Sequence, residues 1–244
     1  MNVDRPICRP FKRAATLDRP GRPGGPPRIL AAGPGHGVGF TLIELLVVVG
    51  ILGVLAGLLL PAAGRAREKA MVARVRMELQ ALGLALEMYA EDHEGRVPPV
   101  RVNCNSDLAE HWCQLPVELA RDGYLPRSDR PGMDSFLEDP FHRGHTYKYA
   151  APGPQLLNGS PAGHYALWVP DDFPRNRSDR GRYVSDPRTA PVRWVLWSMG
   201  PRPRSPESQH THAPLAAASW YQRVGGGGVI VRYADREGRS YSSP

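Results

Sequence analysis

An uninterrupted apolar run at residues 38–64 constrains this chain more than any other feature of its sequence. From Phe40 to Pro61 the run covers 22 residues, which as an α-helix would span about 33 Å, close to the hydrocarbon thickness of a bilayer. A cleaved secretory signal has a shorter apolar region, so the run predicts a membrane-spanning helix. One carboxylate, Glu44, lies near its start, where insertion of a charge into hydrocarbon costs roughly 2.5–3.5 kcal/mol. We therefore expect Glu44 to have a function.

The segment before this run is basic and rich in proline and glycine. Residues 1–39 contain seven Lys and Arg against two Asp, so they carry +5 of the chain's net charge of +7 and leave +2 for the remainder. Their low hydrophobicity and lack of periodicity predict a disordered leader. Basic residues that flank a spanning helix stay on the cytoplasmic side. The charge therefore predicts membrane orientation, and we expect no nucleic acid among the partners.

A second helical pattern follows the apolar run. Over residues 64–94 apolar residues recur at steps of three and four, which predicts an amphipathic continuation of the same helix. This core stripe comprises Val72, Val75, Leu79, Leu82, Leu86 and Tyr89. Gly95 ends the pattern. Because Pro61 lacks a backbone N–H, we expect a kink or local unwinding there, in a stretch that Gly53 also weakens.

The remaining residues, 95–244, have the composition of a small domain with many loops. The whole chain contains 26 Gly and 26 Pro, and much of its apolar content lies between Phe40 and Leu86. Leu115–Leu125 predicts one or two helical turns. Runs of aromatic or β-branched residues predict strands of a small antiparallel sheet at Thr146–Ala150, His164–Val169, Arg193–Ser198 and Val229–Tyr233. Loops are expected at 170–190 and 200–228.

Three cysteines are present, of which Cys8 lies in the leader. Cys104 and Cys113 remain, separated by eight residues, and in an exported domain such a pair predicts a disulfide that closes a short loop. The alternative is two thiols that never come within bridging distance. His111 belongs to no recognisable zinc-binding spacing, and we expect neither a metal nor a cofactor.

The junction Gly39-Phe40-Thr41-Leu42-Ile43-Glu44, followed by apolar residues, resembles the leader junction of type IV pilins and type II secretion pseudopilins. In that family the prepilin peptidase, a membrane aspartyl protease, cuts after the glycine and methylates the new N-terminus. The resemblance implies cleavage between Gly39 and Phe40 and N-methylation of Phe40. It places Glu44 and Pro61 at the fifth and twenty-second mature positions. It also implies that Glu44 pairs with the terminal amine of an adjacent subunit, which joins two costly buried charges in one ion pair.

Later segments of the chain are similar to the G-type major pseudopilins. They are Asp139-Pro140-Phe141, Tyr147-Lys148-Tyr149, Pro152-Gly153 and Trp194–Gly200. In that family an acidic C-terminal loop binds calcium, whereas residues 201–214 offer Glu207 as their one carboxylate. Calcium prefers several oxygen ligands, so we expect that site to be missing or altered.

Two other classes of function compete with this one. An enzyme needs a catalytic set, and the candidates lack a third partner at matching spacing. These candidates are Asp139, His142, His145, His210 and His212. Gly225–Gly228 lacks the Lys-Ser/Thr of a phosphate-binding loop and is interpreted as a flexible turn. A binding module on a plain membrane anchor would keep residues 1–39, whereas a pilin-like subunit would lose them.

Together these patterns predict a pilin-like α+β protein in which one long N-terminal helix packs on a small antiparallel sheet with long loops. The expected parts are a cleaved leader at 1–39, a helix at 40–94 that spans the inner membrane once at 40–63 and is amphipathic at 64–94, and a periplasmic domain at 95–244.

The expected function is that of a pseudopilus subunit of a type II secretion system, without enzymatic activity. A minor type IV pilin for adhesion or DNA uptake is the alternative. Expected partners are further copies of the chain, prepilin peptidase, the inner-membrane assembly platform, minor pseudopilins and the inner membrane itself.

Overall fold

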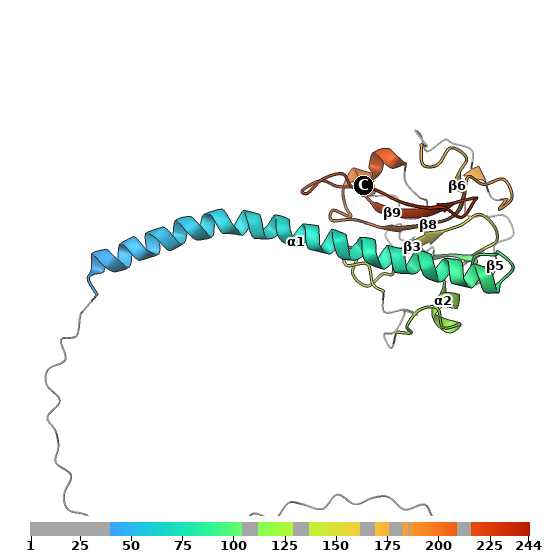
Figure 1. The fold of residues 1–244 in the computed structure, drawn as a ribbon, viewed down its shortest axis with the longest axis horizontal. Helices are drawn as coiled ribbons and strands as arrows, with labels where there is room; N and C mark the ends of the chain where they lie inside the picture. The colour runs from blue at the N-terminus through green and yellow to red at the C-terminus, as the bar shows by residue number, and fades with distance from the viewer. Residues whose placement is uncertain are drawn as a thin grey trace, which may run out of the picture. The chain divides into compact units, whose positions relative to one another are not determined.

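The computed structural model describes residues 40–103, 112–128, 137–161, 169–175, 183–184, 186–208 and 216–244. Contacts divide the chain into two units, residues 1–49 and residues 50–244. The longest element is α1, Leu42–Asp92, a helix of 51 residues (Figure 1). It ends where predicted, just before Gly95, whose φ of 80° is a conformation that residues with a side chain rarely adopt.

The segment from Phe40 to Pro61, which includes the first part of α1, is largely apolar, and all of its residues are exposed. Among the described residues, α1 is the one helix long and apolar enough to cross a membrane, with a mean hydropathy of 2.8 over 18 residues. An apolar surface of this extent is unfavourable in water. By its length and composition, this half of α1 fits a single-pass membrane anchor.

The helix continues through Gly53 and Pro61 without a break. Pro61 removes one backbone hydrogen bond, but its leucine and alanine neighbours are good helix formers and keep the flanking turns intact. A kink or local unwinding at Pro61 therefore stays a prediction.

The strands of the described residues form two four-stranded sheets and one two-stranded sheet. The first sheet, in the order β2-β1-β4-β5, consists of β1 (Val100–Asn103), β2 (Trp112–Gln114), β4 (Gln155–Leu157) and β5 (Ser160–Pro161). The second, in the order β10-β9-β8-β3, consists of β3 (Lys148–Ala150), β8 (Val192–Ser198), β9 (Ile230–Asp235) and β10 (Ser240–Ser242). The third pairs β6 (Val169–Pro170) with β7 (Tyr183–Val184).

The second sheet is antiparallel and contains the predicted strands at β3, β8 and β9. The first sheet was not predicted, and its β1–β4 pair is parallel. The prediction that residues 170–190 form only a loop was also wrong, because β7 lies there. Strands of two to four residues are too short for an alternating pattern to stand out. The candidate strand at His164–Val169 lies outside the described residues except for Val169, which begins β6.

The second half of α1 packs one face on the second sheet. All six residues of the core stripe are buried, and they join β8 residues such as Trp194 and Leu196 in one hydrophobic core. Figure 1 shows this half of the helix running alongside β3, β8 and β9. The predicted amphipathic helix and its pilin-like packing are confirmed.

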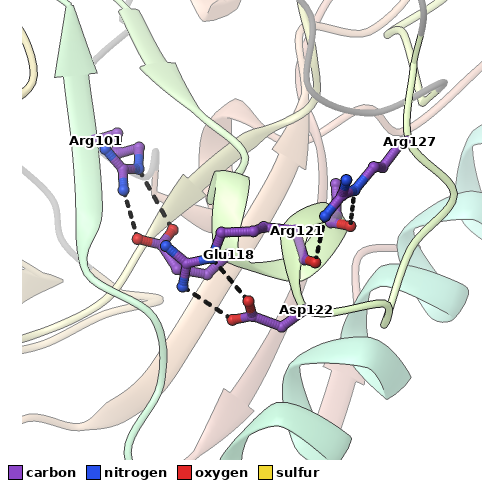
Figure 2. Close-up of polar contacts among 6 residues, drawn as sticks. Arg101, Glu118, Arg121, Asp122 and Arg127 are labelled. Atoms are coloured by element: carbon purple, nitrogen blue, oxygen red, sulfur yellow. Dashed lines mark hydrogen bonds and ion pairs between the residues drawn. The ribbon is translucent and has the colours of Figure 1, made fainter.

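A short helix, α2 (Val117–Arg121), occupies part of the predicted Leu115–Leu125 helical segment. It is tied to β1 by an ion pair between Arg101 and the buried Glu118 (Figure 2). Arg127 closes its C-terminal end by donating from Nε to the Ala120 carbonyl over 3.2 Å and from Nη2 to the Arg121 carbonyl over 2.7 Å. These bonds satisfy carbonyls that a helix end leaves without partners. Two single-turn 3-10 helices, η2 (Pro206–Ser208) and η3 (Ala217–Ser219), lie in the later loops.

Candidate functional site

Thr41 and Glu44 form a capping box at the start of α1. The backbone N–H of Thr41 donates to Glu44 Oε2 over 2.9 Å, and its hydroxyl donates to the same oxygen over 2.8 Å. In return, the backbone N–H of Glu44 donates to Thr41 Oγ1 over 3.2 Å. This reciprocal arrangement satisfies donors at the N-terminus, where the helix dipole also favours a negative charge. Glu44 is therefore held by its own helix, a contact that the Thr-x-x-Glu pattern could have predicted.

Several predicted site residues are only partly covered by the structure. Gly39 and Cys104 lie outside the described residues, and of Cys113 only the backbone is described, in β2 opposite Val102. Phe40 is 80% exposed at the start of the apolar surface. The cleavage site, the N-methylation and the disulfide remain predictions.

Glu68 and Glu78 are among the carboxylates on α1 that accept hydrogen bonds from tyrosines of the domain. Tyr221 donates its hydroxyl to Glu68 Oε1 over 3.0 Å, and the backbone N–H of Gly225 donates to the same oxygen over 2.9 Å. Burial, reinforced by the bond to Glu68, raises the pKa of Tyr221 to about 12. Tyr147 donates in the same way to Glu78, and its burial and this bond raise the pKa of its phenol strongly.

A third carboxylate, Glu87, connects α1 to β8. Trp194 Nε1 donates to Glu87 Oε1 over 2.7 Å, and Arg193 Nη1 lies 2.9 Å from Oε2. Glu78 and Glu87 lie beside the core stripe, and Glu68 continues it one turn before Val72, so polar contacts border the apolar stripe. They fix the rotation of α1 on the sheet, because a turn of the helix would break hydrogen bonds to partly buried groups. Sequence analysis did not identify these three residues.

The family-like segments around Asp139 and Ser198 meet at one buried carboxylate. Asp139 is fully buried and accepts hydrogen bonds from Ser198 Oγ at 2.8 Å, the Met199 backbone N–H at 2.9 Å and the Phe141 backbone N–H at 3.0 Å. Burial raises the pKa of this carboxyl, while these bonds and the nearby Lys148 charge favour its ionised form. Both oxygens of Asp139 therefore accept hydrogen bonds. Asp139 is a structural residue that links the end of β8 to the turn at residues 139–142.

Gly200 and Gly228 allow the backbone just after β8 to touch the glycine-rich segment. A Cβ added at Gly200, where φ is 70°, would lie 1.9 Å from the Gly228 carbonyl oxygen. A Cβ at Gly228 would lie 2.7 Å from the backbone of Trp220. The interpretation of Gly225–Gly228 as a merely flexible turn was incomplete, since this segment packs closely on its neighbours.

Two of the candidate catalytic histidines, His142 and His145, lie in the part of the chain that the structure describes. His142 and His145 stack on each other with ring centroids 3.9 Å apart. Burial lowers the pKa of His142 to about 4, and the charge of Lys148 acts in the same direction. His210 and His212 lie outside the described residues. Within the described ranges, no group of three or more His, Cys, Asp or Glu side chains is placed to hold a metal ion.

Comparison with known proteins gives a consistent result. The chain is 32% identical to the type II secretion system core protein G of Pseudomonas aeruginosa over 122 residues, which cover 47% of this chain and 74% of that protein. It is 31% identical to the core protein G of Pectobacterium carotovorum subsp. carotovorum over 151 residues, covering 61% and 85%. It is 34% identical to that of Escherichia coli (strain K12) over 119 residues, covering 48% and 81%.

No family model and no solved structure matches the chain. The similarity to the three relatives nevertheless extends over about three quarters or more of each of them. It agrees with the long apolar helix and with the buried contacts that join the motif segments. The chain belongs to the type II secretion system core protein G family.

Proposed function

We propose that this chain is a structural subunit of the pseudopilus of a type II secretion system and that its activity is assembly rather than catalysis. The observation that carries the proposal is a family match combined with an apolar helix whose residues 40–61 are all exposed. A helix in lipid can exchange its lipid contacts for contacts with similar helices, because both surroundings are apolar. The adhesion or DNA-uptake alternative has less support, since the relatives carry the secretion-system name.

Maturation begins with cleavage after Gly39 and N-methylation of Phe40 by prepilin peptidase. Removal of the leader leaves a positive amine at Phe40, next to the apolar layer. Glu44 of a neighbouring subunit then pairs with this amine, which lowers the cost of both charges and sets the axial register between subunits. Before assembly, the capping box with Thr41 provides Glu44 with hydrogen bonds inside its own helix.

The domain boundaries remain those expected from the sequence, with a leader at 1–39, a helix at 40–94 and a periplasmic domain at 95–244. The N-terminus lies in the cytoplasm and the subunit passes once through the inner membrane. Its partners are the assembly platform, minor pseudopilins and further copies. Local opening of α1 between Gly53 and Pro61 accompanies entry into the filament, and a filament structure with an unbroken helix there would refute it.

The decisive measurement is the N-terminal mass of the membrane-bound protein. The expected species begins at Phe40 and carries one added methyl group, whereas an intact chain that keeps Met1 beside an active peptidase contradicts the proposal. Gly39→Leu should block processing, because the bulky side chain occupies the cleavage position. Glu44→Val should insert into the membrane and be processed, yet yield few filaments. An undiminished filament yield for Glu44→Val would remove the charge pairing.

A further inference from the structure

Basic side chains follow the apolar segment of α1 at once. Arg65, Arg67 and Lys69 are exposed and come directly after the apolar run that ends at Gly64. With a helical rise of 1.5 Å per residue, they lie about 2–8 Å beyond its end. This is within one headgroup layer of a bilayer, which is roughly 5–8 Å thick. A membrane that contains residues 40–63 therefore places these three cations beside the phosphates of its lipids.

Two loops of the domain bring further arginines to the same turn of α1. Glu68 accepts hydrogen bonds from the Tyr221 hydroxyl and from the Gly225 backbone N–H, so the loop between these two residues lies against the helix there. Arg223 belongs to this loop and is exposed. Arg202, from the segment after β8, reaches the same place, because its Nη2 lies 3.9 Å from the position of a Cβ added at Gly225. Basic residues that are far apart in the sequence therefore gather around one turn of α1.

We call this set the basic collar, and it comprises Arg65, Arg67, Lys69, Arg202 and Arg223. None of these five side chains forms an ion pair with another residue that the structure describes. By contrast, Arg74 pairs with Glu78, and Arg76 donates to the Pro244 carbonyl oxygen further along α1. Glu68, the carboxylate in the turn of the collar, already accepts two hydrogen bonds. The charge of the collar is therefore left for a partner outside the described part of the subunit.

Membrane orientation accounts for basic residues on only one side of a spanning segment. Residues 1–39 are already basic, so the collar, on the other side, needs another role. Clusters of about four to eight Lys and Arg beside a spanning helix attract anionic headgroups. Four of the five collar residues are arginines, whose guanidinium groups bind phosphate through paired hydrogen bonds. The collar therefore has the position, the charge and the donors of a phosphate-binding surface.

We propose that the basic collar binds the phosphate headgroups of anionic phospholipids on the side of the membrane where the domain lies. A lipid surface is the partner because three collar residues directly follow the spanning segment at headgroup depth. Arg202 and Arg223 extend this contact to the folded domain, so the lipid stabilises the domain and fixes its orientation on the membrane. The inference goes beyond filament assembly, since it concerns the single subunit in its membrane and requires only the spanning segment.

Thermal unfolding of the full chain in detergent micelles tests the proposal. The micelles contain equal amounts of either phosphatidylglycerol, which is anionic, or phosphatidylcholine, which carries no net charge, and unfolding is followed by the fluorescence of the buried Trp194 and Trp197. A lipid that binds the folded collar stabilises the folded domain, so phosphatidylglycerol should raise the melting temperature by about 4 °C or more above phosphatidylcholine. The difference should fall by at least half in about 0.5 M NaCl, which screens exposed charges. Equal melting temperatures in the two lipids would overturn the proposal.

The test variant combines Arg202→Gln with Arg223→Gln, and the matched control combines Arg96→Gln with Arg236→Gln. Both variants lose two positive charges, but Arg96 and Arg236 line a groove beyond the other end of α1. The test variant should lose at least half of the shift that phosphatidylglycerol produces, whereas the control should keep it. All variants retain residues 1–39, so the charge of that segment does not distinguish them. Equal shifts in the two variants would overturn the collar.

Two further probes test the choice of partner in micelles of phosphatidylcholine. Inorganic phosphate and a short DNA duplex, each at the same concentration of phosphate groups as the anionic lipid, should leave the melting temperature unchanged. A shift as large as that of the lipid would replace the lipid surface with a site for a free anion in the first case and for a nucleic acid in the second.

Native mass spectrometry of the full chain, in an equal mixture of the two lipids, measures binding without unfolding. The wild type should carry phosphatidylglycerol at least about three-fold more often than phosphatidylcholine. Replacement of Arg65, Arg67 and Lys69 by Gln should bring this ratio close to that of the lipid mixture, and an unchanged ratio would overturn their role. A chain that shows the lipid preference yet forms no filaments would refute the proposed function alone.

Discussion

The buried carboxylate of Asp139 offers the sharpest test of how the domain is held together. In Asp139→Asn, the amide keeps one oxygen for Ser198 Oγ and the Phe141 N–H. Its NH₂ group then faces the Met199 N–H, which has lost the acceptor that lay 2.9 Å away. The substitution therefore places two hydrogen-bond donors opposite each other in a buried site that excludes water.

The magnitude follows from these contacts. A hydrogen bond to a charged group contributes roughly 1.5–3 kcal/mol, and an orphaned buried donor costs roughly 1–3 kcal/mol. Loss of the charge that faces buried Lys148 adds to the cost, while relief of the desolvated carboxylate offsets part of it. We expect Asp139→Asn to lower the free energy of unfolding by about 3 kcal/mol. For a domain of this size, that corresponds to a fall of about 6–12 °C in melting temperature.

The assay is thermal unfolding of the full chain in detergent micelles, followed by the fluorescence of the buried Trp194 and Trp197. Asp171→Asn is the matched control, because Asp171 is exposed and such surface changes stay within about 0.5 kcal/mol. Ser198→Ala removes one donor and should cost about 1–1.5 kcal/mol. Melting of Asp139→Asn within about 2 °C of wild type would show that Asp139 does not hold β8 to the turn.

Three further outcomes follow from the structure. Gly200→Ala would press a Cβ against a backbone carbonyl and should lower the free energy of unfolding by about 4 kcal/mol or more. Gly123→Ala, with open space around it, should lower it by about 1–2 kcal/mol. Similar urea midpoints for the two variants would contradict the close contact at Gly200. Burial lowers the pKa of His142 to about 4. As the pH falls, the unfolded chain therefore binds a proton at His142 at a higher pH than the folded chain does. Stability present above pH 6.5 should therefore fall by about 1–2 kcal/mol towards pH 4, and an unaltered pH profile in His142→Asn would exclude this cause. Cys104→Ser should lower the melting temperature under oxidising conditions, and identical wild-type melting with and without reductant would exclude the disulfide.

The parts of this protein that depend on neighbours in sequence could be predicted from the sequence. Helical periodicity is a local property, so the core stripe from Val72 to Tyr89 and the end of α1 before Gly95 were both correct. The apolar run and the junction at Gly39 and Phe40 likewise indicated the family without reference to a fold. The capping box at Glu44 was equally accessible, because its two residues are three positions apart.

The tertiary structure decided which distant residues meet. Ser198 lies 59 residues from Asp139, and no local pattern indicates that one donates to the other. The parallel pairing of β1 with β4 and the contact of Gly200 with Gly228 also depend on the path of the chain between them. Short strands and single buried hydrogen bonds carry little periodic signal, since their stability comes from partners that folding brings together. The sequence therefore predicted the helix, whereas the contacts between the helix and the domain were decided by long-range packing.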